Sequence, residues 1–164
     1  MYPWLVYLHV LATLTFLFAH GVTSIVAWRL RSVPDPATAR AWLGLYAAGR
    51  YVMLFYGSLL VLLVSGVAAG FMGDWWSQGW IWLSLALLVA IIVGMFLIGT
   101  RHYGRLRQAL GLPWFDGRKE HPAGEPAPNE EIQPLLASSP ALALTAIGFG
   151  GIAVILWLMM FKPF

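Results

Sequence analysis

The stretch LHVLATLTFLFAHG, Leu8–Gly21, places two histidines inside an apolar run that continues to Trp28 without a charged side chain. Three further stretches contain no Asp, Glu, Lys or Arg, and they are Tyr51–Gly73, Trp75–Thr100 and Ile132–Phe161. Each stretch is longer than the roughly 20 residues that a helix needs to cross the hydrocarbon core of a bilayer. The sequence therefore predicts four transmembrane helices.

The composition agrees with a lipid environment. The 164 residues are 60% hydrophobic and 10% charged, whereas a soluble domain is about 45–50% apolar and about 25% charged. We predict an all-α, integral membrane four-helix bundle that forms a single domain over residues 1–164. The predicted spans cover about residues 3–28, 51–72, 78–101 and 140–161.

The basic residues predict how the bundle is oriented. Nine of the ten Lys and Arg residues lie in the two segments 29–50 and 102–139 or directly at their edges, and only Lys162 lies elsewhere. By the positive-inside rule these two segments are cytoplasmic loops, and the N-terminus and C-terminus lie outside. We predict a multi-pass protein of the inner cell membrane, in which the net charge of +3 reflects orientation rather than binding of nucleic acid.

The two predicted loops differ in composition. In residues 29–50, Pro34 and Pro36 end the first helix, and the residues after them carry apolar side chains at spacings that favour a short interfacial helix. Residues 102–139 first continue the third helix beyond the bilayer and then become rich in Pro, Gly and Glu, which predicts a largely irregular segment without a core of its own.

His9 and His20 are the first candidate site residues. Residues eleven apart on an α-helix differ by only about 20° around the axis and lie roughly 16 Å apart along it, so both imidazoles share one face of the first helix. Polar groups in a membrane helix point to the bundle interior. Each histidine can hydrogen-bond a neighbouring helix, or ligate haem iron or another metal, but one metal cannot use both.

Three further residues could complete a haem site. Met95 lies in the third predicted helix near the depth of His20, which permits a His/Met iron, although Met in an apolar helix is ordinarily a packing residue. Arg50 and Arg101 lie at the cytoplasmic ends of the second and third helices. Their guanidinium groups could bind haem propionates, or contact anionic lipid and set the topology.

Parts of the sequence resemble a known superfamily. The quoted first helix, extended to YLHVLATLTFLFAHGVTSIVAWRLR, and the later segments LLVLLVSGVAAGF and GWIWLSLALLVAIIVGMFLI resemble an uncharacterised family of predicted integral membrane proteins. That family is related to the copper-resistance D type proteins and to the bacterial membrane-bound, haem-containing protoporphyrinogen oxidase. The resemblance implies that His9 corresponds to the first-helix histidine that holds haem in the oxidase. The oxidase also carries a lysine in a later helix, whereas no predicted span here contains Lys.

These observations give three hypotheses of function. The first is a small membrane protein that binds haem b or another metal through His9 or His20 and serves as an electron-transfer or accessory subunit. The second is a cofactor-free structural or lipid-binding subunit of a larger complex, with another membrane subunit or a second copy of the chain as partner. The third is a metal or small-solute permease. The sequence contains no nucleophile–base pair, phosphate-binding loop or carboxylate dyad, so no residues suited to hydrolytic catalysis are identified. Whether the chain is an enzyme stays open.

Overall fold

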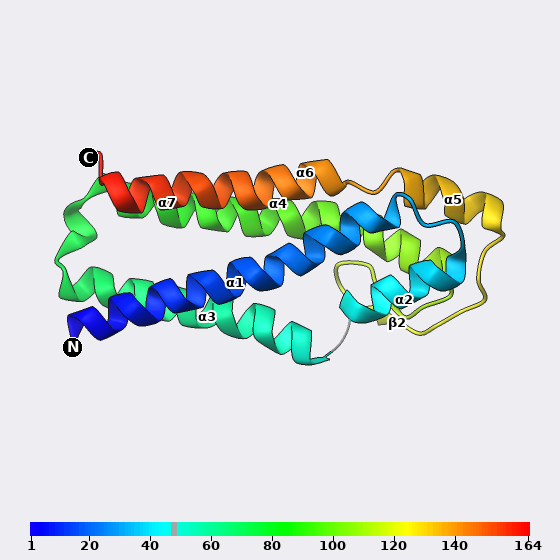
Figure 1. Cartoon of the computed structure of the whole chain (residues 1–164), viewed down its shortest axis with the longest axis horizontal. Coiled ribbons are helices and arrows are strands. Elements are labelled where there is room, and N and C mark those ends of the chain that lie inside the picture. The colour runs from blue at the N-terminus through cyan, green and yellow to red at the C-terminus, as the bar shows by residue number, and fades with distance from the viewer. Residues whose placement is uncertain (47–48) are drawn as a thin grey trace.

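The computed structural model describes residues 1–46 and 49–164 and is dominated by four long helices that run side by side (Figure 1). The first three are α1 (Tyr2–Leu30), α3 (Gly49–Met72) and α4 (Gly79–Ala109). The fourth is continuous in space but consists of α6 (Ala141–Thr145), a π-helical turn η2 (Ala146–Gly150) and α7 (Gly151–Phe161). The shorter elements are α2 (Pro36–Tyr46), the 3-10 turn η1 (Trp75–Ser77), β1 (Trp114–Phe115), β2 (Glu120–His121) and α5 (Asn129–Ala137).

The four predicted spans coincide with the four long helices, and by length and composition each of these helices is able to cross a membrane. The short helix predicted in residues 29–50 is also present, as α2. The prediction for residues 102–139 was only partly right. In addition to the end of α4, this segment forms a two-stranded hairpin and the nine-residue helix α5. The high Pro and Glu content of the segment led us to overlook the helical spacing of Ile132 and Leu136. These residues lie four positions apart, and both are buried.

The long helices pack mainly in two pairs, α1 with α3 and α4 with α7. The helix α1 runs obliquely between the pairs, so its first half lies against α3 and its end approaches α6 (Figure 1). A hydrogen bond of 3.1 Å from the Trp28 indole N–H to the Thr145 hydroxyl joins α1 to α6. Both chain termini lie at the same end of the bundle (Figure 1).

At this terminal end, tryptophans and the C-terminus close the bundle. Trp80 and Leu158 are buried against each other, and the Trp80 backbone N–H donates a 3.2 Å hydrogen bond to the Phe164 carbonyl. The Lys162 ammonium lies 4.1 Å from the centre of the Trp75 ring, a cation–π contact. The last residues of the chain are therefore fastened to the α3–α4 connection.

The opposite end of the bundle contains the larger apolar core. It combines the end of α1, the helix α2, the end of α4 and the helix α5, and its buried members are Val26, Leu30, Val33, Ala39, Leu43, Leu106, Leu110, Ile132 and Leu136. Most of these residues lie beyond the predicted spans. The two segments predicted as loops thus fold together with the helix ends, where they bury apolar surface away from water.

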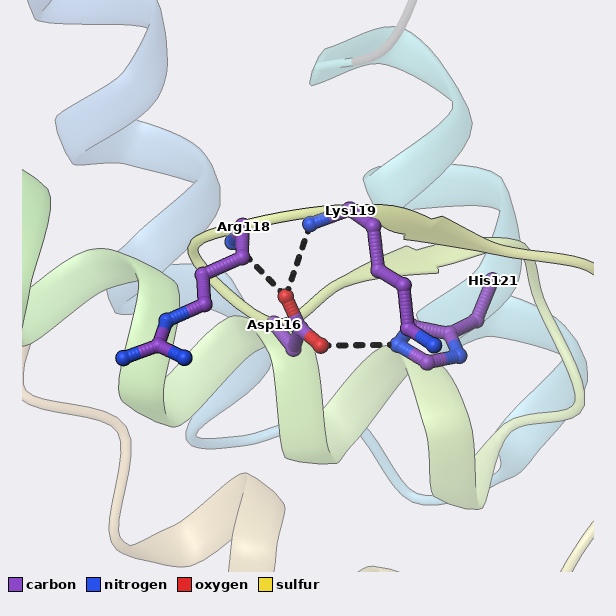
Figure 2. A network of polar contacts seen from close by, with 4 residues as sticks. All are labelled: Asp116, Arg118, Lys119 and His121. Atoms are coloured by element: carbon purple, nitrogen blue, oxygen red, sulfur yellow. Dashed lines mark hydrogen bonds and ion pairs between the residues drawn. The ribbon is translucent and has the colours of Figure 1, made fainter.

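The hairpin of β1 and β2 is held by one carboxylate, which Figure 2 shows in detail. The Asp116 carboxylate accepts hydrogen bonds from the backbone N–H groups of Arg118 (2.7 Å) and Lys119 (2.9 Å) and from the His121 ring (2.9 Å). The His121 ring also stacks on Trp114, with 4.1 Å between ring centres. Chiefly through the His121 and backbone hydrogen bonds, this environment lowers the pKa of the Asp116 carboxyl.

We expect the hairpin to depend on the ionised form of Asp116. Because its folded pKa is lowered, the stabilisation is present above the ordinary aspartate pKa of 3.8 and is lost as the pH falls through the lower, folded value. An NMR titration of the Asp116 carboxyl carbon should give a midpoint below 3.8, and the amide shifts of Arg118 and Lys119 should move with it. A midpoint at or above the ordinary value would contradict these contacts.

The four-span topology can be tested by labelling of introduced cysteines, since the chain contains no native cysteine. Ser77 and Gly124 are both exposed, and they lie in η1 and in the segment between β2 and α5, at opposite ends of the bundle. Ser77→Cys and Gly124→Cys should react with a membrane-impermeant maleimide from opposite sides of the membrane. Reaction of both from the same side would contradict the four-span topology.

Candidate functional site

His9 reaches across the interface between α1 and α3. Its Nδ1 lies 2.9 Å from the carbonyl oxygen of Leu62 and 3.4 Å from the Ser65 hydroxyl. A carbonyl oxygen can only accept a hydrogen bond, so Nδ1 carries the proton and donates. In the neutral ring the lone pair therefore lies on Nε2, the nitrogen that a metal or another donor would use.

The backbone of α3 admits the His9 ring because residue 66 is glycine. A Cβ atom added at Gly66 would lie 2.9 Å from Cε1 and 3.1 Å from Nδ1 of His9, closer than side chains tolerate. In an α-helix the Leu62 carbonyl points toward the N–H of Gly66, so a side chain at position 66 would stand beside the oxygen that His9 reaches. The glycine at position 66 thus lets an imidazole pack against α3.

His20 lies at a closed position deeper in the bundle. It is 2% exposed, and the rings of Phe16, Phe55 and Phe149 surround it at centre-to-centre distances of 6.2, 6.5 and 4.9 Å. The Thr23 hydroxyl donates to the His20 carbonyl at 2.7 Å, so its oxygen is able to accept from the His20 Nδ1 at 3.4 Å. These neighbours come from α1, α3 and η2.

The second nitrogen of His20 faces the backbone of η2. A Cβ atom at Gly148 would lie only 2.1 Å from Nε2, and this buried nitrogen has no hydrogen-bond partner among the described residues. Metal–imidazole bonds are about 2.0–2.1 Å long, so an iron bonded to Nε2 would stand against the Gly148 backbone. The geometry at His20 does not fit a haem or a metal ion unless α1 and η2 separate.

Two of the other predicted residues, Met95 and Arg101, lie on α4. Met95 lies half-buried on α4, which packs mainly along α7. Arg101 lies roughly 33 Å from the start of α4, whereas His9 lies roughly 10 Å from the start of α1 at the same end of the bundle. A haem on His9 therefore cannot place its propionates on Arg101. Arg50 lies in the first turn of α3, and its side chain lies outside the described part of the structure.

No group of three or more His, Cys, Asp or Glu side chains that could hold a metal ion occurs in residues 1–46 and 49–164. A metal on His9 would thus take its remaining ligands from a porphyrin, from another molecule or from donors of other types. His9, His20 and Arg101 are spread along the length of the bundle and do not form one site. His9 alone has the geometry of a ligand whose second nitrogen is already oriented.

The sequence reasoning missed two features of these sites. The first is the Leu62 carbonyl, since a backbone acceptor carries no sequence signal beyond the glycine four residues later. The second is the contact between Gly148 and His20, since the glycine-rich run GFGG at 148–151 does not reveal which side chain lies against it. π-Helical turns are frequent at functional sites, and this one is used to admit an imidazole.

No known protein-family model, curated protein or solved structure matches this chain. Its function is therefore argued from its own residues.

The contact between Gly148 and His20 gives a test with a matched control. Gly148→Ala should lower the free energy of unfolding by about 1–3 kcal/mol because the new methyl group collides with the imidazole. Gly150→Ala introduces a methyl group into open space two residues away, and should be neutral or stabilising by up to about 1 kcal/mol. Thermal unfolding in detergent, followed by circular dichroism, measures both.

A third variant assigns the loss to the imidazole. In a His20→Ala background the obstacle is removed, so Gly148→Ala should cost clearly less than in the wild type. Equal effects of Gly148→Ala and Gly150→Ala, or an undiminished cost in the His20→Ala background, would contradict the packing described here.

Proposed function

We propose that the protein is a multi-pass protein of the inner membrane, with both termini outside and the α2, hairpin and α5 end in the cytoplasm. The four apolar helices support membrane insertion. Nine of the ten basic residues lie in or beside the two segments at the end opposite the termini, and such an excess of Lys and Arg is typical of the cytoplasmic face.

We further propose that His9 ligates haem b or another metal and that the protein acts as an electron-transfer or accessory membrane subunit. The hydrogen bond from Nδ1 to the Leu62 carbonyl carries this proposal. Histidines that bind metals almost always donate their other ring N–H to a carbonyl, carboxylate or water, which fixes the tautomer and the orientation of the ring. A bound haem would supply one-electron chemistry at its iron.

The residues around His9 have distinct tasks in this proposal. The Leu62 carbonyl holds the proton on Nδ1 and keeps the Nε2 lone pair available. Gly66 allows the imidazole to lie against α3, and the Ser65 hydroxyl, which also donates to carbonyls of its own helix, adds a polar neighbour at 3.4 Å. His20 then has a structural role, because its Nε2 is covered by Gly148.

A second candidate is a cofactor-free subunit of a larger membrane complex or of a homo-oligomer. It is favoured by the extent of uncovered apolar surface. Only 17% of the most hydrophobic window is buried in each of α3, α4 and the fourth long helix. Such surface suits lipid tails or the helices of another membrane subunit. The permease hypothesis has no comparable observation in its favour and stays a prediction from the sequence.

The visible spectrum of the purified protein distinguishes these candidates. Protein expressed with adequate haem should show a Soret band, or in the metal alternative should contain metal in stoichiometric amount. His9→Ala should abolish the bound cofactor. His20→Ala should retain it and lose only about 0.6–2 kcal/mol of stability through packing and hydrogen bonding.

Two outcomes would count against the His9 proposal. Wild-type protein without haem absorbance and without stoichiometric metal would leave the cofactor-free subunit as the better function. A Soret band that survives in His9→Ala but disappears in His20→Ala would mean that α1 and η2 separate to admit the haem at the deeper histidine.

A further inference from the structure

A pocket of about 340 Å³ lies at the basic end of α4 and has no part in the site around His9. One side is formed by Arg101, His102 and Arg105 of α4, and the other by Leu135 and Ser138 at the end of α5. Arg101 and Arg105 are four residues apart, so they stand on the same face of the helix, one turn from each other. The pocket therefore combines two guanidinium groups and an imidazole.

The wall opposite α4 is fixed by buried hydrogen bonds. Ser139 is 4% exposed, and its hydroxyl lies 3.1 Å from the Ala27 carbonyl of α1 and 3.2 Å from the Tyr103 hydroxyl of α4. These contacts join α1, α4 and the α5–α6 connection beside the pocket. The pocket is thus a built feature of the fold rather than a gap beside a loose segment.

The positive charge in the pocket is not neutralised by the chain. The ion pair between His121 and Asp116 is the only one among the described residues, so neither Arg101 nor Arg105 is paired with a carboxylate there. The acidic residues of α5, Glu130 and Glu131, lie in its first turn, roughly 10 Å along the helix from Ser138. The His102 Nε2 is buried and without a hydrogen-bond partner in the described part of the chain.

We propose that this pocket binds the phosphate group of an anionic phospholipid. Guanidinium groups match phosphate oxygens in geometry and charge, and a phosphate oxygen could also accept a hydrogen bond from the N–H of the His102 ring. The predicted third span ends at Arg101, so the pocket lies at the depth of the headgroups. Ile98 and Pro140, the remaining lining residues, are apolar and suit the glycerol and upper acyl region of a lipid better than a free ion.

This inference requires the four helices to lie in a bilayer, and it does not depend on a cofactor at His9. Basic pockets between helices at the cytoplasmic side are recognised positions for acidic headgroups. In this pocket, two arginines without a carboxylate partner, a buried imidazole nitrogen and the apolar side chains of Ile98 and Pro140 lie at one place.

Native mass spectrometry of the full chain in detergent tests the proposal, with phosphatidylglycerol and phosphatidylcholine of identical acyl chains as probes. Each arginine near a phosphate should contribute about fivefold in affinity. The wild type should therefore bind phosphatidylglycerol about 30-fold more tightly than the Arg101→Gln/Arg105→Gln variant does. The single Arg105→Gln variant should lose about fivefold, which keeps the test decisive if the double variant folds poorly.

The control variant is Arg118→Gln/Lys119→Gln, which removes the same charge from the hairpin at the same end of the bundle. It should bind phosphatidylglycerol as the wild type does, because Arg118 and Lys119 do not line the pocket. Equal losses in both double variants would show diffuse attraction to a basic face and overturn the pocket. Equal affinity of the wild type for the two lipids would overturn it as well.

Inorganic phosphate separates the two sources of the same chemistry. A large excess of it should displace phosphatidylglycerol only weakly, since the lipid also contacts Ile98 and Pro140. If inorganic phosphate alone stabilises the wild type against thermal unfolding as much as phosphatidylglycerol does, and the Arg101→Gln/Arg105→Gln variant loses both effects, the pocket is a site for free phosphate and the lipid proposal is wrong.

Discussion

The hydrogen bond from the His9 Nδ1 to the Leu62 carbonyl is the contact on which the functional interpretation of this bundle depends. In lipid there is no water to satisfy a polar side chain, so an imidazole must find its partner within the protein. The carbonyl groups of a neighbouring helix are already paired within that helix and are shielded by side chains. A glycine four residues after a carbonyl has no side chain to cover it. Gly66 in this way leaves the Leu62 carbonyl accessible to His9. One position in the sequence thus determines both how closely α1 and α3 approach and which nitrogen of His9 remains available.

The second histidine shows how a similar packing arrangement gives a different chemistry. Gly148 also faces an imidazole across a helix interface, but there the glycine covers Nε2 itself, and three phenylalanine rings enclose the remainder. The resulting buried, unpartnered nitrogen costs free energy on the order of 1–3 kcal/mol. The surrounding rings supply dispersion contacts to the imidazole, and Gly148 brings the backbone of the π-helical turn against it. A histidine in an apolar helix is thus not by itself a metal ligand. It can bind a metal only where the lone pair of its ring nitrogen points to free space.

The sequence predicted the helices better than it predicted the site. Long runs without charge locate such helices well because the signal lies in composition and length, and the four predicted spans coincide with four helices that are long and apolar enough to cross a membrane. The shared face of His9 and His20 also follows from helix geometry. Their different environments do not, because each depends on a glycine in a helix distant in the chain. The helix α5 was missed for a related reason: Ile132 and Leu136 become informative only when α2 and α4 supply the apolar surface that they cover.

The two ends of the bundle are built differently, and this difference bears on where ligands can act. At the terminal end, tryptophan rings, Lys162 and the backbone of Phe164 close the space between η1 and the C-terminus. At the other end a core of nine buried side chains holds α2, α4 and α5 together, and this core fixes the backbone from which Arg101 and Arg105 project. That core is stabilised by exclusion of water from its apolar side chains, whereas α1 and α3 meet through close packing and a few hydrogen bonds. The interface of α1 and α3 therefore presents one oriented imidazole, whereas the opposite end presents arginines on a backbone that a packed core holds in place.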